Sequence, residues 1–309
     1  MAKKAKVAKG RFSNIFVQPE AIRAKLLSDA IDDYLYDTRN PKGEEEPEPI
    51  HRFRPSQLGK ANCVRKMVYE YLGAEYETEL SAHDGQLHRV FDNGHDVHDR
   101  LQGYLADMTK WSKGRISLIG RWVCKKCGDK YGFAPKGGKP EDHWCPRPDK
   151  CKCGSEKFHF GEVDVAIPAH LTWGQADGIV IIDGEKYVLE IKSANPNTFN
   201  SLNSKPPVYY LPQINLYMHG LGIFQTIFLF ENKATQEIKE IRYRYDSKVL
   251  KPIFEKTSVA VKHIKAKKMP PRLKSPTEVK EHCRLCEYRQ ICGLTDDFKE
   301  KLRVRDYAK

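Results

Sequence analysis

The sequence predicts an α/β or α+β fold built around a central mixed sheet, and two observations support this. Runs with the alternation and β-branched content of strands fill the middle of the chain. Segments with apolar residues at helical spacing lie on both sides of that block. Helices that flank a group of strands can bury the apolar faces of both kinds of element in one layered core.

The expected elements follow in chain order. A basic, Lys-rich start precedes an amphipathic helix marked by Ile22 to Leu35, and an acidic, Pro-containing linker covers 37–50. A longer helix is predicted over Leu87–Met108, interrupted or entered near Asn93-Gly94. Strands are predicted over Ile116–Val123, Glu162–Ile167, Ala176–Ile182, Tyr187–Lys192, Thr226–Phe230 and Glu237–Tyr245. Helices are predicted again over Val208–Leu221 and Val249–Lys267.

Composition narrows the class of partner. The 309 residues carry 53 Lys+Arg against 41 Asp+Glu, a formal charge of +12, which favours a polyanion such as nucleic acid. The sequence has no apolar stretch of the roughly 20 residues that a bilayer span needs, and its basic start lacks a following apolar region. We therefore expect no membrane role and a cytoplasmic location. Nine cysteines in such a chain indicate metal ligation before disulfides.

The segment from Gly174 to Lys192 reads as a β-hairpin. Asp183-Gly184 suits a two-residue turn, whose central residues both need positive φ. If Ile182 faces Glu185, then Asp177 lies opposite Glu190 and Gln175 lies opposite Lys192. Lys192, two positions after Glu190, points to the same face.

Two carboxylates this close on apolar strands are costly to ionise without a cation between them. Mg²⁺ binds oxygen ligands, keeps several waters and accepts phosphate oxygens, so such a pair suits hydrolysis of a phosphodiester. Lys192 would orient or deprotonate the attacking water. The alternative is an exposed hairpin with an ordinary Glu/Lys pair.

These residues match a known pattern. Gly174-x-x-Asp177 followed by Glu190-Ile191-Lys192 resembles the PD-(D/E)xK nuclease signature, and two further motifs resemble its RecB-like branch. Gly94-x-x-x-His98 resembles the motif whose histidine is a metal ligand, although His83, His88 and His95 lie nearby. Gln213-x-x-x-Tyr217 resembles a helical motif that contacts DNA or supports the lysine.

The resemblance implies a restriction-endonuclease-like central mixed sheet flanked by helices. It also implies that His98, Asp177, Glu190 and the Ile191 carbonyl hold Mg²⁺ or Mn²⁺. Lys192, Gln213 and Tyr217 would complete the catalytic set.

Two groups of cysteines flank or interrupt this core. Cys283, Cys286 and Cys292 form a C-x2-C-x5-C run, and Cys63 can supply a fourth thiolate for a 4Fe-4S cluster or zinc. This arrangement resembles the iron-sulfur exonucleases associated with CRISPR systems and the cluster-bearing nuclease domains of helicase-nucleases, which implies a 4Fe-4S cluster that joins the two ends of the core. Free buried thiols are the alternative.

The second cysteine group lies between the long helix and the hairpin. Its spacing is typical of a zinc ribbon, and a redox Cys-x-x-Cys is the alternative. Four of five cysteines would bind Zn²⁺, with Cys145 or Cys151 completing the set: Cys124, Cys127, Cys145, Cys151 and Cys153. The motifs and the two cysteine groups together predict a basic N-terminal segment over 1–50, a nuclease domain over 51–309 and an inserted ribbon over 121–157.

Together these features predict a metal-dependent DNA exonuclease, bacterial or phage-encoded, that acts on linear single- or double-stranded ends. Its role would be DNA recombination, repair or CRISPR or phage DNA processing, with recombination or CRISPR proteins as partners. Two other functions remain open. One is a structure-specific endonuclease, and the other is a non-catalytic protein that binds DNA and retains the fold. The sequence does not give polarity or oligomeric state.

Overall fold

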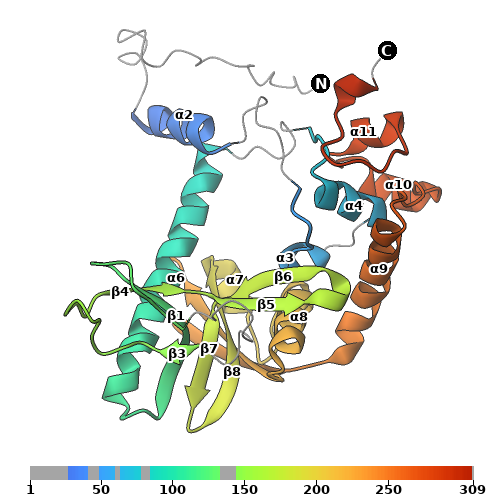
Figure 1. The fold of residues 1–309 in the computed structure, drawn as a ribbon. Coiled ribbons are helices and arrows are strands. Elements are labelled where there is room, and N and C mark those ends of the chain that lie inside the picture. The colour runs from blue at the N-terminus through green and yellow to red at the C-terminus, as the bar shows by residue number, and fades with distance from the viewer. Residues whose placement is uncertain (1–26, 41–48, 60–62, 78–83, 133–143, 308–309) are drawn as a thin grey trace.

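The centre of the molecule is a mixed sheet with helices around it (Figure 1). The computed structural model describes residues 27–40, 49–59, 63–77, 84–132 and 144–307. Within them, the sheet has the strand order β10-β9-β8-β7-β1-β2, and β3 and β4 also pair with β1. β8 runs parallel to β9, whereas the other pairs in this sheet are antiparallel. The expected mixed α/β sheet is confirmed.

The strands of the central sheet are β1 (Ile116–Cys124), β2 (Lys130–Tyr131), β3 (Cys145–Pro146), β4 (Phe158–Gly161), β7 (Gly178–Ile182), β8 (Glu185–Ala194), β9 (Gln225–Asn232) and β10 (Ile238–Arg244). A separate antiparallel ladder consists of β5 (Val163–Ile167) and β6 (Thr172–Ala176). The helices are α2 (Leu27–Arg39), α3 (Pro55–Leu58), α4 (Val64–Leu72), α6 (Gly85–Trp111), α7 (Pro196–Ser201), α8 (Leu211–Leu221), α9 (Ser247–Lys265), α10 (Pro276–His282) and α11 (Arg289–Leu294).

The β7–β8 hairpin has the predicted turn and register. Asp183 and Gly184 adopt φ of 49° and 89°, the two positive values that this turn requires. Ile182 faces Glu185, and the ladder continues to Gly178 opposite Leu189. The predicted pairing of Gln175 with Lys192 is wrong, because Gln175 pairs with Asp164 of β5.

The predicted strand over Ala176–Ile182 is in fact two strands. β6 ends at Ala176 and β7 begins at Gly178, so Asp177 stands alone at the change of partner from β5 to β8. A run of alternating residues gives no sign of such a change, because both ladders have the same side-chain period.

Helices cover both faces of β8. Leu189 and Ile191 pack with Val97 and Leu101 of α6 in one apolar cluster. Val188 faces the other way and packs with α8 in a second cluster. Because side chains alternate along a strand, Glu190 and Lys192 share the face of Val188.

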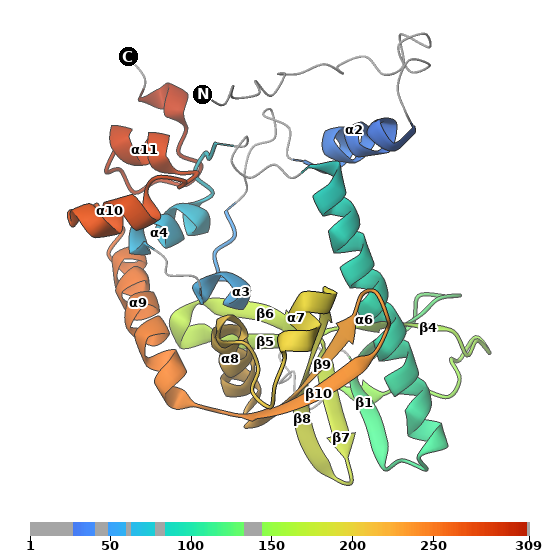
Figure 2. The same ribbon diagram turned by 180° about the vertical axis from the view of Figure 1, so that it is seen from behind.

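The long helix α6 is continuous, so the predicted interruption at Asn93-Gly94 is wrong. Asp84 caps the helix by accepting a hydrogen bond of 2.7 Å from the N–H of Leu87. The N-terminal half of α6 extends beyond the sheet and packs against α2 (Figure 2). Arg39 of α2 bonds Asp92 there at 2.6 Å. Packing against α2 supplies tertiary contacts that offset the low helix propensity of glycine.

On the other side of the sheet, α9 leads to the C-terminal helices, which pack around α4 (Figure 2). Arg65 of α4 is 2% exposed and donates to the carbonyls of Pro270 and Thr295, each at 2.6 Å, and to the Tyr69 hydroxyl at 3.0 Å. These bonds join segments more than 200 residues apart in sequence.

Some predictions concern residues outside the described part. The basic start, the first residues of the predicted N-terminal helix and most of the linker lie there, while the helix itself is observed as α2. Searched over the described residues, no helix has the length and apolar content needed to cross a membrane.

Candidate functional site

Asp177 is held at the junction of the two ladders. Its side chain is buried, and its Oδ2 accepts a hydrogen bond of 2.6 Å from the N–H of Ile191 on β8. Its own carbonyl accepts from the side chain of Gln102 on α6, at 2.8 Å. These two bonds leave Oδ1 directed toward His98 of the same helix, whose Nδ1 lies 3.4 Å away.

Glu190 lies beside Asp177 in the β7–β8 register, one step beyond the last ladder pair. Its side chain is 2% exposed, and Oε1 lies 2.5 Å from the Nζ of Lys192. Among the described residues, nothing donates a hydrogen bond to its buried Oε2. Burial raises the pKa of Glu190 to about 7, since the charge of Lys192 offsets only part of the lost hydration and the charge of Asp177 adds to the effect.

The surrounding charges shift the other groups in a consistent way. Burial lowers the pKa of His98, but the bond and charge of Asp177 outweigh it, and the net pKa is raised. Burial opposes ionisation of Asp177, yet His98 brings its pKa below the ordinary value. The pKa of Lys192 is raised because the charges of Glu190 and Asp177 outweigh its burial. The carboxylates therefore stabilise the charged forms of His98 and Lys192, and these two basic residues stabilise the charged forms of the carboxylates.

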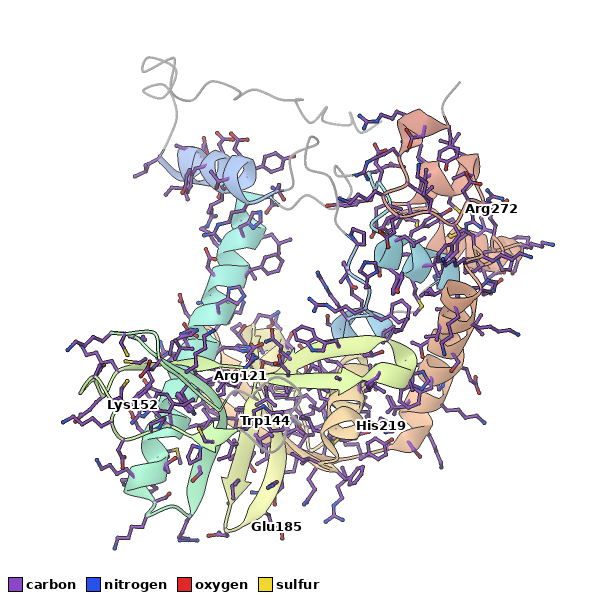
Figure 3. The ribbon with its side chains drawn as sticks, in the orientation of Figure 1. Arg121, Trp144, Lys152, Glu185, His219 and Arg272 are labelled. Carbon is purple, nitrogen blue, oxygen red and sulfur yellow. The ribbon has the colours of Figure 1, made fainter. Side chains whose placement is uncertain are left out.

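A further carboxylate belongs to this group. Glu162 lies between β4 and β5, and one donor atom each from His98, Glu162 and Asp177 lie within 4.8 Å of one another. Burial, and then the charge of Asp177, raise the pKa of Glu162. Arg121, near the middle of the molecule in Figure 3, bonds Asp164 at 2.6 Å.

The sequence analysis missed Glu162 except as the start of a predicted strand. The signal that would have found it is the β5–β6 register, in which Val163 faces Ala176. One step further along, Glu162 faces Asp177, by the same reasoning that placed Asp177 beside Glu190. Without a predicted β5–β6 hairpin, that step was not available.

Gln213 and Tyr217 face the same centre from α8. The Gln213 side chain donates to the Tyr217 hydroxyl at 3.0 Å. Burial, and then the charge of Glu190, raise the pKa of Tyr217, so its phenol is neutral near the carboxylates. Tyr210, just before α8, places its ring centroid 5.3 Å from the Nζ of Lys192. The structure thus brings the predicted residues together around one point.

The donor set fits a divalent ion. In the described part of the chain, Glu162 and Asp177 form one group of donors with His98, and Glu190 lies beside Asp177 by the strand register. Lys192 forms an ion pair with Glu190. The buried, unpaired Oε2 of Glu190 is a position that an ion would satisfy. Carboxylate oxygens with one imidazole suit Mg²⁺ or Mn²⁺.

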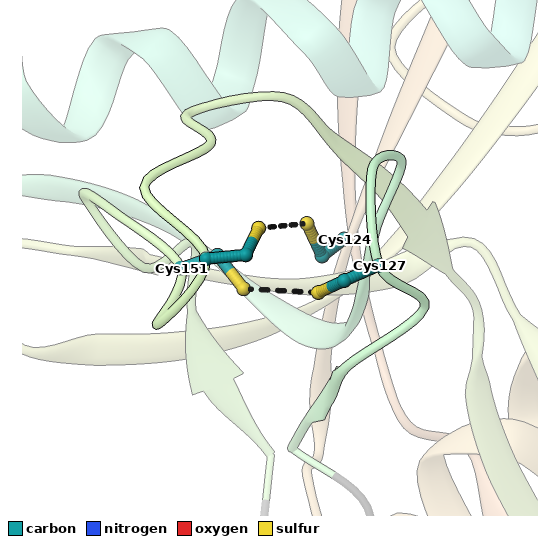
Figure 4. Close-up of side chains that lie close together, drawn as sticks. Cys124, Cys127 and Cys151 are labelled. Carbon is teal, nitrogen blue, oxygen red and sulfur yellow. Dashed lines mark hydrogen bonds between the residues drawn. The ribbon is translucent and has the colours of Figure 1, made fainter.

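Four of the five ribbon cysteines form a second site (Figure 4). The sulfurs of Cys124, Cys127, Cys151 and Cys153 lie within 4.8 Å of one another. The distance from Cys124 Sγ to Cys153 Sγ is 3.6 Å, and that from Cys127 Sγ to Cys151 Sγ is 3.5 Å. A tetrahedral zinc site with Zn–S bonds of ~2.3 Å has sulfurs ~3.8 Å apart. The four thiols are thus spaced as a mononuclear metal site requires.

Cys145 is outside this group, which decides the alternative that the sequence left open. It lies on β3 opposite Gly120 of β1, and its carbonyl accepts a hydrogen bond of 2.9 Å from the indole N–H of Trp122. This pairing fixes Cys145 on β3 beside Gly120, four residues before Cys124 on β1 and outside the group of four thiols.

The other four cysteines line one cavity of ≈ 60 Å³. Cys63 precedes α4, whereas Cys283, Cys286 and Cys292 come from the C-terminal segment. Their sulfurs do not form a tight group within 4.8 Å of the kind found in the ribbon, as far as the described residues show. Arg65 and Lys66 also line this cavity. These cysteines from distant segments thus line one cavity, and their sharing of one metal site stays a prediction.

Comparison with known proteins found remote similarity. No protein-family model and no curated protein matches the sequence. The chain is similar to the crystal structure of LHK-Exo in complex with dAMP, at 14% identity and a TM-score of 0.39, covering 70% of this chain and 89% of that chain. It is also similar to SSO0001, at 14% identity and a TM-score of 0.36, covering 87% and 96%.

A second structure of LHK-Exo, an alkaline exonuclease from Laribacter hongkongensis, is 13% identical with a TM-score of 0.36, covering 70% of this chain and 89% of that one. At this distance, the chemistry of the site is inferred from the side chains of the chain itself.

Proposed function

We propose that this protein is a divalent-metal-dependent DNA exonuclease of the PD-(D/E)xK type. The observation that carries the proposal is a pair of neighbouring buried carboxylates, Asp177 and Glu190. His98 and Lys192 lie beside them, and Glu190 Oε2 has no hydrogen-bond partner among the described residues. Burying two ionised carboxylates costs free energy, and a bound cation would compensate for that cost.

His98, Asp177, Glu190 and the carbonyl of Ile191 would hold Mg²⁺ or Mn²⁺. When bound, the ion supplies charge stabilisation at the phosphoryl group and a more acidic water. Lys192, fixed by Glu190 at 2.5 Å, donates to the attacking water and orients it. Gln213 and Tyr217, joined by a hydrogen bond of 3.0 Å on α8, lie beside these carboxylates and would contact the DNA strand.

The substrate is DNA with a free end, and it can be single- or double-stranded. The formal charge of +12 favours a polyanion, and phosphate contacts confer affinity without reading sequence. Affinity should therefore fall with salt, and sequence preference should be weak. A role in recombination, repair or CRISPR or phage DNA processing, with partner proteins from those systems, is consistent with this activity.

The two cysteine sites complete the proposal. The thiols of Cys124, Cys127, Cys151 and Cys153 would hold one Zn²⁺ in a ribbon inserted over 121–157. The other four would hold a 4Fe-4S cluster: Cys63, Cys283, Cys286 and Cys292. Iron and zinc content of anaerobically purified protein tests both, with about four irons and one zinc expected per chain. Zinc alone would rule out the cluster.

The activity is tested with end-labelled linear DNA and closed circular DNA of the same sequence, in Mn²⁺. Wild-type protein should degrade the linear form and leave the circle intact. Glu190→Gln removes a charged ligand and should slow cleavage by about a hundredfold or more. Glu185→Gln, on the exposed end of the same strand, is the matched control and should cleave at the wild-type rate. Undigested linear DNA would refute the proposal, and a cut circle would make the protein an endonuclease.

A further inference from the structure

Glu162 has no assigned task, although it lies within the same group of donors as His98 and Asp177. We propose that Glu162 is a direct ligand of the divalent ion, so that the centre has three carboxylates: one just before β5, one just after β6 and one in the middle of β8. This inference rests on the proposed function, because it takes an ion at Asp177 as given. It assigns a ligand that the sequence motifs do not contain.

The backbone places Glu162 for this task. The β5–β6 ladder has Val163 opposite Ala176, so Glu162 and Asp177 are the next facing pair, just where the ladder ends. Glu190 stands on the other side of Asp177 by the register of β7 and β8. Asp177 is therefore the middle of three acids, each from a different ladder position.

The Glu162 carboxylate is also available. Within the part of the chain that the structure describes, no side chain donates a hydrogen bond to it or forms an ion pair with it. Arg121, whose charge acts on Glu162, makes its ion pair with Asp164 instead, at 2.6 Å. The charges of His98, Arg121 and Lys192 offset only part of the cost of burying this carboxylate beside Asp177, and a bound cation would offset the rest.

A separate observation also points to a ligand at this place. Glu190 is 2% exposed and its Oε2 has no hydrogen-bond partner among the described residues. By the register of β7 and β8, Glu190 lies beside Asp177, and so in the neighbourhood of an ion that His98, Glu162 and Asp177 would hold.

Mn²⁺ affinity shows whether Glu162 is a ligand of the ion or only lies near it. Mn²⁺ affinity is measured by the loss of the free-ion EPR signal in full-length protein with its cysteine sites loaded. Glu162→Gln should weaken Mn²⁺ binding by about tenfold or more. Asp177→Asn should abolish it. Glu185→Gln, at the tip of the β7–β8 hairpin far from the centre (Figure 3), should bind as the wild type does.

A second readout distinguishes coordination from charge alone. Tb³⁺ replaces the ion, and luminescence decay in H₂O and D₂O counts the waters that it binds. If Glu162 is a ligand, Glu162→Ala adds at least one coordinated water. If Glu162 acts only through its charge, affinity falls and the water count stays the same, which would overturn the inference. Glu162→Asp keeps the charge but shortens the side chain, and it serves as the test if Glu162→Gln or Glu162→Ala does not fold. We expect Glu162→Asp to bind Mn²⁺ more weakly and to add a water to bound Tb³⁺.

The two proposals fail in different ways. Wild-type Mn²⁺ affinity in Glu162→Gln, with binding lost in Asp177→Asn, would remove Glu162 from the centre and leave the nuclease proposal intact. Equal binding by wild type and Asp177→Asn would remove the ion site, and the proposed function with it.

Discussion

The two cysteine sites of this protein are built in opposite ways. Cys124, Cys127, Cys151 and Cys153 come from one short stretch of chain, and their sulfurs lie close enough for a single ion to touch all four. Cys63 and the three C-terminal cysteines come from the two ends of the fold and surround a cavity of ≈ 60 Å³ instead. The ribbon cysteines are thus spaced for one ion, whereas the terminal cysteines line a cavity without forming such a tight group among the described residues.

The difference has an energetic consequence. Cross-linking neighbouring residues restrains few conformations of the unfolded chain, whereas cross-linking distant residues restrains many. The ribbon site should therefore matter for local structure, and the terminal site for the stability of the whole core. Each prediction below changes one of the two sites, or the contacts beside it.

Cys63→Ser should have the largest effect. Under the proposed cluster, it removes the ligand that would link the N-terminal part of the core to the C-terminal cysteines, which lie roughly 220 residues away in sequence. By analogy with a covalent cross-link of that loop length, the free energy of unfolding should fall by about 5 kcal/mol. Anaerobic urea denaturation and iron content check this together.

The matched control is Cys145→Ser, which alters a cysteine of neither site. Unchanged stability and full iron content in Cys63→Ser would show that Cys63 does not bind the cluster, and that α4 is held to the C-terminal segment by protein contacts alone.

Those protein contacts give the second prediction. Arg65 is buried and bonds two carbonyls, of Pro270 and Thr295, at 2.6 Å each. Arg65→Met leaves both carbonyls without that donor and should lower the free energy of unfolding by about 3 kcal/mol. Iron content should stay at the wild-type level, because Arg65 is not a ligand. Arg284→Lys, at an exposed position, is the control. Loss of iron in Arg65→Met would mean that the two attachments cannot be separated.

Much of the β7–β8 hairpin could be predicted from sequence because its determinants are local. The Asp183-Gly184 turn fixes the register of β7 and β8, and that register brings Asp177 next to Glu190. The Gly-x-x-x-His motif predicts His98 as a ligand, and α6 places its Nδ1 3.4 Å from Asp177 Oδ1. Short-range turn chemistry and period-2 alternation are readable in one sequence.

What could not be predicted depends on contacts between distant segments. Asp177 changes ladder partner because β6 pairs with β5, and nothing in the residues of 176–182 signals that change. Glu162 joins the centre by the same pairing. α6 is continuous through Gly94, which lies near Ser193 of β8, and local helix propensity does not report such tertiary packing. The choice of Cys151 over Cys145 depends on β3 pairing with β1.

The smallest effect on global stability is expected in the ribbon. Cys151→Ser should release the zinc and open the ribbon loops to trypsin near Lys150 and Lys152, while changing the free energy of unfolding of the core by at most about 1 kcal/mol. Zinc content and limited proteolysis check this. Cys145→Ser should retain the zinc and the wild-type digestion pattern, because its sulfur lies outside the group of four. The reverse result, with zinc lost from Cys145→Ser and kept in Cys151→Ser, would mean that the metal draws β3 out of the sheet to complete its coordination. In that case zinc binding would depend on moving a strand of the central sheet, and the contrast between a local and a long-range cysteine site would no longer hold.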